Sequence, residues 1–177
     1  LSGDLAGDDE PDFANNGENA YHVVYAYGVS PTAVLEGFTV TGGNAYGSSD
    51  QRYGGGMSSS NGHPTVKDCL FIRNCASSRG GGLYSRGSIS IHDCTFEGNK
   101  TYEGGGAYCR DGNADILRCH FRSNRGGEGG GLHLFNGTYT TSDCMFYENF
   151  AGNEGGGLYL VYSDTSVTNC LIIGNTC

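Results

Sequence analysis

The sequence predicts an all-β fold, a right-handed parallel β-helix (a solenoid) of about six coils with three short strands in each coil of about 25 residues. Several residue positions share one repeat length, which is the mark of stacked repeats. Apolar residues alternate with a period of two over short stretches, which indicates strands. A glycine triplet also returns at one point of each repeat, where tight turns or close backbone contacts are needed.

The repeat is defined by cysteine, asparagine and glycine positions that advance together. Consecutive cysteines of the series are separated by 25, 25, 25 and 26 residues, and an asparagine follows each cysteine by five residues. An apolar residue stands two positions after each cysteine. The series are Cys69, Cys94, Cys119, Cys144 and Cys170; Asn74, Asn99, Asn124, Asn149 and Asn175; and glycine triplets that begin at Gly54, Gly80, Gly104, Gly129 and Gly155.

Each repeat divides into three short segments, each too short for a helix. The first follows the glycine triplet, the second ends before the cysteine, and the third carries the cysteine and the next apolar residue on one face. Leucine-rich repeats have a similar length, but they require several leucines in a fixed frame, and most repeats here contain one or two. The β-helix is therefore the favoured architecture, with parallel sheets wrapped around a narrow core.

A single domain over residues 1–177 is expected. Residues 1–20 form an irregular N-terminal segment, residues 21–53 a divergent first coil with a protruding loop at 44–53, and residues 54–177 the regular repeats. In the first coil, Phe38 takes the cysteine position and Val40 the apolar position. The chain starts at Leu1 and ends in mid-repeat, so we expect it to be a fragment of a longer protein.

Composition narrows the possible partners. The formal net charge is −9 and there is no run of Lys or Arg, so a nucleic-acid partner is not expected. No apolar stretch approaches 18 residues, so no membrane span is expected in this segment. The 32 glycines do not indicate disorder, because apolar residues make up 37 % of the chain and recur at fixed positions.

The asparagine and cysteine series are expected to be structural ladders. Asparagine tolerates left-handed backbone angles at bends, and stacked amides can bond one another. The cysteines should point inward as small apolar residues. Free thiols are favoured over disulfides because in-register parallel strands would strain the bridge, although the spacing does not exclude one. No paired Cys or His spacing indicates zinc.

One series of aromatic residues is expected on the outer face of the first strands. It comprises Tyr84, Tyr108, His133 and Tyr159. Such a stripe could stack on sugar rings, which makes these four residues candidate ligand-binding residues. The alternative is that the rings stack on each other and stabilise the sheet.

Acidic residues form two further candidate sites. Glu103, Glu128 and Glu154 each precede a glycine triplet, so their carboxylates could approach to ~5 Å in successive coils. With Arg79 or Arg125 they are candidate catalytic residues, or a Ca²⁺ site, against the simpler alternative of a solvated turn. A second group is Asp4, Asp8, Asp9, Glu10 and Asp12, which also suggests Ca²⁺. No other cofactor is expected.

The pairing of Gly-Gly-x-apolar with F-x-x-N resembles the repeats of polymorphic outer membrane proteins, which are surface adhesins. The matches lie within residues 33–177: Gly81-Gly82-Leu83-Tyr84 with Phe96-Glu97-Gly98-Asn99, Gly105-Gly106-Ala107-Tyr108 with Phe121-Arg122-Ser123-Asn124, and Gly130-Gly131-Leu132-His133 with Phe146-Tyr147-Glu148-Asn149. In the last repeat Ile172 replaces the phenylalanine. The chain also resembles secreted bacterial proteins of the pectin-lyase-like β-helix superfamily. These resemblances imply an extracellular or outer-surface location.

Two functional hypotheses remain from the sequence. The first is a non-catalytic extracellular β-helix module for adhesion or for binding a glycan or another surface partner. The second is part of a polysaccharide lyase or glycoside hydrolase, for which the repeat contains no specific catalytic motif. A fold alone does not decide between them, because function depends on individual sites.

Overall fold

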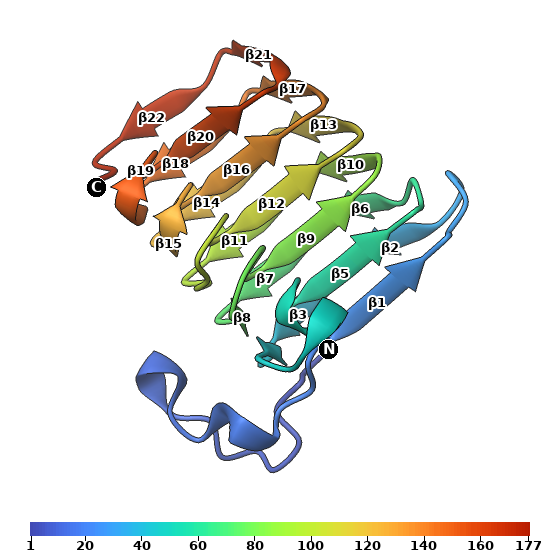
Figure 1. Cartoon of the computed structure of the whole chain (residues 1–177), viewed down its shortest axis with the longest axis vertical. Coiled ribbons are helices and arrows are strands. Elements are labelled where there is room, and N and C mark those ends of the chain that lie inside the picture. Colours follow the sequence, from blue (N-terminus) through green and yellow to red (C-terminus); the bar gives the residue numbers. More distant parts are fainter.

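The computed structural model describes residues 1–177 and is a parallel β-solenoid with three six-stranded sheets (Figure 1). The chain passes through the first, second and third sheet in turn and then enters the next coil. Every pairing within these sheets is parallel and joins successive coils. The predicted all-β solenoid, with three strands in each repeat, is confirmed.

The three sheets are each built from one strand per coil. The first sheet contains β1 (Val24–Tyr27), β5 (Met57–Ser60), β9 (Leu83–Arg86), β12 (Ala107–Arg110), β16 (Leu132–Phe135) and β20 (Leu158–Val161). The second contains β2 (Val34–Glu36), β6 (Thr65–Lys67), β10 (Ile89–His92), β13 (Asn113–Leu117), β17 (Thr138–Ser142) and β21 (Asp164–Thr168). The third contains β3 (Thr39–Thr41), β7 (Leu70–Ile72), β11 (Thr95–Glu97), β14 (His120–Arg122), β18 (Met145–Tyr147) and β22 (Leu171–Ile173).

Short elements lie where the chain leaves the third sheet and in the N-terminal region. Two further parallel pairs are β4 (Asn44–Ala45) with β8 (Cys75–Ala76), and β15 (Arg125–Glu128) with β19 (Phe150–Glu154). The 3-10 helices are η1 (Pro11–Phe13), η2 (Asn16–Glu18) and η3 (Ser49–Arg52). The last of these lies in the protruding loop that the sequence predicts.

Equivalent side chains of successive coils stack directly over one another. The third-sheet phenylalanines are in register, and their ring centroids are 5.0, 4.8 and 4.8 Å apart from Phe71 to Phe146. In the first coil Val40 pairs with Phe71, as expected from the sequence. Inward residues of all three sheets together form one core of 21 buried residues.

The asparagine series forms a continuous amide ladder inside the solenoid (Asn74 to Asn175). Asn124 donates from Nδ2 to Phe96 O and to Asn149 Oδ1, at 2.9 Å in both cases. Its own Oδ1 accepts from the backbone and side-chain nitrogens of Asn99, at 3.0 Å each. The same contacts recur in the neighbouring coils. These amides therefore carry the hydrogen bonding from coil to coil at this bend.

One detail of the asparagine expectation is wrong. The left-handed residue at this bend is the one before the asparagine, such as Ser123 or Glu148, and not the asparagine itself. That turn directs the amide inward, where Asn124 is fully buried. The asparagine is required because its amide replaces backbone partners at the bend, where strand pairing stops.

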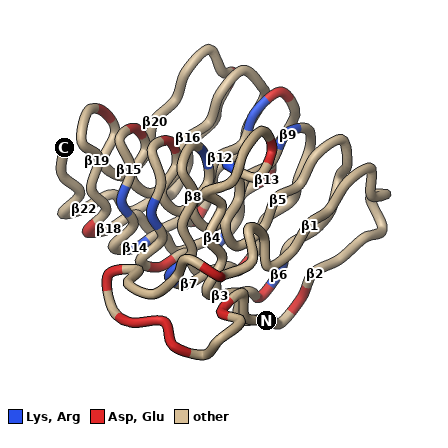
Figure 2. The backbone as a smooth tube through the Cα atoms, turned by 60° about the horizontal axis from the view of Figure 1, so that its bottom comes forward, with Lys and Arg blue, Asp and Glu red and all other residues tan.

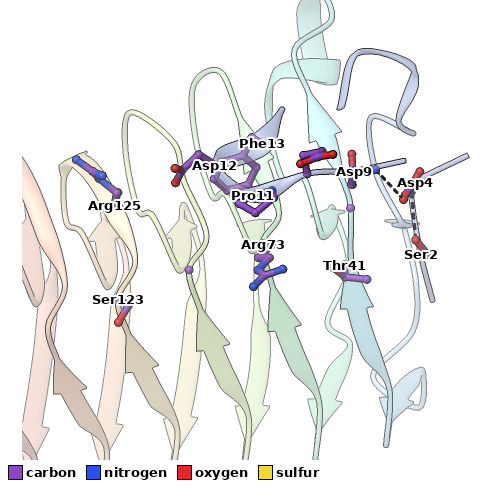
Figure 3. A pocket seen from close by; sticks show the side chains of 13 residues that line it. Ser2, Asp4, Asp9, Pro11, Asp12, Phe13, Thr41, Arg73, Ser123 and Arg125 are labelled. Carbon is purple, nitrogen blue, oxygen red and sulfur yellow. Dashed lines mark hydrogen bonds between the residues drawn. The ribbon is translucent and has the colours of Figure 1, made fainter. Parts of the chain in front are cut away.

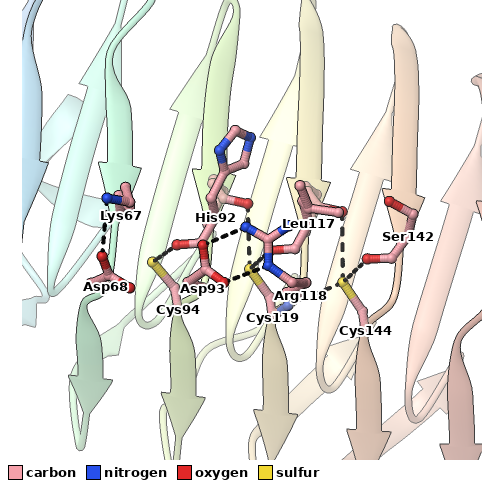
Figure 4. Close-up of polar contacts among 12 residues, drawn as sticks. Lys67, Asp68, His92, Asp93, Cys94, Leu117, Arg118, Cys119, Ser142 and Cys144 are labelled. Atoms are coloured by element: carbon pink, nitrogen blue, oxygen red, sulfur yellow. Dashed lines mark hydrogen bonds and ion pairs between the residues drawn. The ribbon is translucent and has the colours of Figure 1, made fainter.

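The cysteine series lies at the other bend, between the second and third sheets, and points inward (Figure 4). The residue before each cysteine has a positive φ, as in Asp93 (φ 55°) and Arg118 (φ 50°). All cysteines are free thiols, and Cys94, Cys119 and Cys144 are buried. Each Sγ contacts backbone carbonyl oxygens, for example Cys119 Sγ to Ile91 O at 3.4 Å. On the outside of this bend, Arg118 and Asp93 form a two-point ion pair.

The glycine triplets are required by turn geometry and by close contact between coils. Gly104 has φ +67°, a conformation that L residues with side chains rarely adopt. A Cβ on Gly105 would lie 2.3 Å from Gly130 O, and one on Gly106 would lie 2.5 Å from Gly131 O. Successive coils can therefore approach at this bend only without side chains.

We expect Asn124→Ala to lower the free energy of unfolding by about 3 kcal/mol, because it leaves several buried partners without a hydrogen bond. Chemical denaturation of the full chain measures this change. Asn113→Ala, at an exposed position of β13, serves as the control and should change stability by less than about 0.5 kcal/mol. Equal effects of the two substitutions would contradict the stabilising contribution that we expect from the buried amide ladder.

Candidate functional site

The outer face of the first sheet carries two adjoining hollows. The tyrosine hollow, of about 400 Å³, lies over β1, β5 and β9, and the glutamate hollow, of about 390 Å³, lies over β12, β16 and β20. Arg79 and Arg110 line both hollows, so together they form one groove that crosses the coils. This groove brings together most of the side chains that the sequence singles out.

The predicted aromatic stripe lies along this groove, but most of its surface is covered. Tyr84, Tyr108 and His133 are only 4 %, 1 % and 2 % exposed, whereas Tyr159 is half-buried. Tyr84 stacks on Tyr108 with ring centroids 5.9 Å apart, and His133 meets Tyr108 and Tyr159 edge-on at 4.7 and 4.8 Å. The ring faces are thus occupied by each other, as in the sheet-stabilising alternative, and mainly ring edges line the groove.

The tyrosine hollow contains aromatic residues that the sequence reasoning did not select. Tyr25 and Tyr27 on β1 are 58 % and 64 % exposed and line this hollow with Tyr53. Two signals could have identified them. Tyr25 and Tyr27 alternate with apolar residues along a strand, and Tyr53 precedes a glycine triplet as Glu103 does. Tyr53 in turn stacks on Tyr84 at 4.9 Å.

The residues before the glycine triplets stack on one another, and their type changes from coil to coil. Tyr53, Arg79, Glu103 and Glu128 are bridged in sequence, and Glu128 pairs with Glu154. Arg79 Nε lies 2.8 Å from Glu103 Oε2, so one glutamate has a cationic partner. Partial burial, together with the neighbouring charges of Glu103 and Glu154, raises the pKa of Glu128. Hydrogen bonding to Glu154 raises the pKa of Tyr159 to about 12.

The arginines of the groove are each close to a carboxylate. Arg110 Nε is 2.7 Å from Asp111 Oδ2, and Arg86 Nε is 3.8 Å from the same oxygen. Arg79 is paired with Glu103, as described above. The groove thus presents fixed donors beside fixed acceptors, and its charges are largely balanced.

His133 lies at the floor of the glutamate hollow with both ring nitrogens buried and without a hydrogen-bond partner. Burial lowers the pKa of His133 to about 4, against a smaller opposing effect of Glu103. The ring is therefore neutral at physiological pH. It occupies the register position of Tyr108 and Tyr159, so its aromatic ring maintains the stack.

Arg125 does not lie beside the glutamates. It lines a separate hollow of about 380 Å³, which Arg73 and Ser123 of the coils share with Asp12 and Phe13 of the N-terminal segment (Figure 3). The sequence also placed Arg79 near the glutamates, and Arg79 is the arginine found there. Arg125 starts β15 and Glu128 ends it, so the length of this strand separates them. Its guanidinium instead lies over the Phe150 ring at 5.4 Å.

The acidic N-terminal residues only partly converge. Carboxylate oxygens of Asp4, Asp9 and Glu18 lie within 4.8 Å of one another, whereas Asp8, Glu10 and Asp12 are not part of this group. Glu18 was not among the expected residues. Figure 2 shows that acidic residues dominate this N-terminal segment, with basic residues on the neighbouring coils.

We expect stability to fall as the pH drops from 6.5 towards 4, because the unfolded chain then binds a proton at His133 that the folded chain, with its pKa of about 4, does not. His133→Phe keeps the ring stack and removes this contribution. Relative to the unsubstituted chain, the free energy of unfolding of the variant should rise by about 3 kcal/mol between neutral pH and pH 4. Denaturant titrations at several pH values measure the difference, and a difference independent of pH would contradict the assigned burial of the ring.

Comparison with known proteins identifies the fold family. The family described as "Right handed beta helix region" matches residues 12–176, and neither the curated proteins nor the solved structures contain a match. No helix in the structure combines the length and apolar character needed to cross a membrane. The matched region contains the three-sheet solenoid and every residue that lines the groove. The chain therefore belongs to the right-handed β-helix family.

Proposed function

We propose that this chain is a non-catalytic, extracellular or cell-surface β-helix module that binds a glycan in the groove over the first sheet. The observation that carries the proposal is the tyrosine hollow, where exposed tyrosines stand beside arginine–carboxylate pairs. The family membership accounts for the fold and does not identify the ligand. The resemblance to surface adhesin repeats favours a role in adhesion.

The chemistry of the tyrosine hollow suits a sugar ring. Tyr25 and Tyr27 are more than half exposed, so they offer apolar ring surface to the carbon-bound hydrogens of a sugar. Arg86 and Arg110 beside Asp111 offer donors and an acceptor in fixed positions, and a sugar hydroxyl uses both. Because the arginines are already paired, a neutral or weakly charged glycan fits better than a polyanion.

The coil spacing suits an extended ligand. Equivalent groups recur every ~4.8 Å along the groove, since that is the separation of paired strands. A polymer lying across the coils can therefore meet aromatic edges and polar groups on each successive coil. Contacts with several coils would add up even when each contact is modest.

Binding should depend on the two exposed tyrosines. We expect the double substitution Tyr25→Ala and Tyr27→Ala to weaken glycan binding by at least about tenfold, equivalent to about 1.4 kcal/mol. A glycan array identifies a ligand, and titration calorimetry then measures its affinity. Tyr147→Ala, on the outer face of the third sheet, is the matched control. Unchanged affinity in the double variant would rule out this hollow as the binding site.

A second candidate is catalysis on a polysaccharide in the glutamate hollow. Glu128 favours it, because a carboxyl of raised pKa beside a second, arginine-paired carboxylate is the arrangement of an acid and its partner. Adjacent coils place such carboxylates ~5 Å apart, which is similar to the separation of about 5 Å in retaining glycosidases. A lyase would require a base and a cation or arginine near the same sugar.

The two candidates are separated by incubating the chain with a panel of neutral and uronic-acid polymers, with and without Ca²⁺. We expect neither unsaturated products nor new reducing ends. Product that forms with the unsubstituted chain, is lost with Glu128→Gln and persists with Glu148→Gln would replace the binding proposal with the catalytic one. Glu148 is the matched control because it is exposed at a different bend.

A further inference from the structure

Three carboxylates from separate parts of the N-terminal arm (residues 4–19) meet at one point. Asp4, Asp9 and Glu18 each place an oxygen within 4.8 Å of the others. The arm turns back on itself through η1 and η2, and this path brings Glu18 to the two aspartates. None of the three carboxylates forms an ion pair with Lys, Arg or His. Their mutual repulsion is therefore not offset by a protein cation.

A buried amide beside these carboxylates has an oxygen without a partner. Asn19 is 7 % exposed, and its Nδ2 is directed at the Asp9 carboxylate, with distances of 3.1 and 2.9 Å to its two oxygens. The Oδ1 of the same amide is buried and accepts no hydrogen bond. Buried acceptors are normally satisfied. The contact of Nδ2 with Asp9 places the Asn19 Oδ1 close to that carboxylate. Carboxylates cannot donate to it, so a cation bound by them would give this oxygen a partner.

We propose that Asp4, Asp9, Glu18 and Asn19 form a binding site for a divalent cation of the Ca²⁺ class. All the candidate ligand atoms are oxygens, and Ca²⁺ accepts carboxylate, amide and water oxygens in flexible arrangements. The carboxylates are partly or largely exposed, so water can complete the coordination shell. Mg²⁺ suits the site less well, because it demands a near-ideal octahedron, whereas these ligands come from an irregular loop.

Asp4 is held in place for this role by the backbone of the arm. Its Oδ1 accepts from Gly7 N at 2.6 Å and from Asp8 N at 3.3 Å. Gly42 of the first coil packs against the same point, because a Cβ there would lie 2.8 Å from Asp4 N and 3.4 Å from Asp9 Oδ2. The cation would therefore join the two ends of the arm at the point where the arm packs against the start of the solenoid.

The arm covers a thiol that can report on this fastening. Asn16 Nδ2 lies 3.3 Å from Cys75 Sγ, and Asn44 Nδ2 donates to Asn16 O at 2.6 Å. The ammonium of Lys100 lies over the Phe13 ring, 5.8 Å from the ring centroid. Cys75 is only 2 % exposed in this arrangement. Release of the arm would expose it.

Titration calorimetry with CaCl₂ on the full chain tests the site. We expect binding of one Ca²⁺, weakened at least about tenfold by Asp9→Asn with Glu18→Gln. The matched control, Asp8→Asn with Glu10→Gln, removes the same charge from the same arm and should leave the affinity within about twofold. Asn19→Ala should weaken binding without a change in charge. Absence of Ca²⁺ binding, or equal weakening in the control, would overturn the proposal.

A second measurement follows the thiol rather than the metal. Alkylation of Cys75, mapped by mass spectrometry with the exposed Cys177 as reference, should be slow in Ca²⁺ and at least about fivefold faster after chelation. Both charge variants retain the solenoid, which circular dichroism verifies. An equal rate of Cys75 alkylation with and without Ca²⁺ would show that the cation does not hold the arm in place, and would overturn this part of the proposal.

Discussion

Vertical register between coils is the constraint on which the rest of the molecule depends. Each residue lies over its counterpart one repeat away, so every inward position must tolerate contact with a copy of itself. Phenylalanine does so by parallel stacking, and asparagine does so because an amide both donates and accepts, as Asn99, Asn124 and Asn149 show. Glycine does so where backbones touch. A charged side chain cannot satisfy its own copy, and no Asp, Glu, Lys or Arg is buried.

The same constraint explains why the outer ladders change composition. At the position before the glycine triplet three glutamates stack, and partial burial together with the charges of its two neighbours raises the pKa of the middle one, Glu128. The series is stabilised at one end by Arg79 on Glu103 and at the other by the hydroxyl of Tyr159 near Glu154. An outer ladder can therefore vary from coil to coil, and each variation creates a local chemistry. The groove acquires a tyrosine-rich half and a glutamate-rich half in this way.

The sequence predicts the inward ladders well because their spacing equals one coil. Cys94, Phe96 and Asn99 could be assigned to bends and faces from their offsets alone. Exposure could not be predicted, because it depends on the side chains of the neighbouring coils. Tyr108 is covered by Tyr84 and His133, whereas Tyr25, on the terminal strand β1 and beside Ser58, remains open. The expectation of Arg125 beside the glutamates failed because the length of β15 is not encoded in the repeat. The arm has no repeat, so the contact of Glu18 with Asp4 and Asp9 had no sequence signal.

The side chains that the repeat did not predict indicate where a solenoid can acquire a distinctive site. A position that is identical in every coil offers the same group on each of them, so a distinctive site requires positions that depart from the repeat. Besides the outer ladder, the departures here are the first coil, which carries Tyr25 and Tyr27, and the arm, which carries the carboxylate cluster. Both occur at the N-terminal end, where the arm crosses the bend beside β4 and β8. The regular coils thus supply stability and length, and the irregular N-terminal residues supply the side chains on which both proposed binding sites depend.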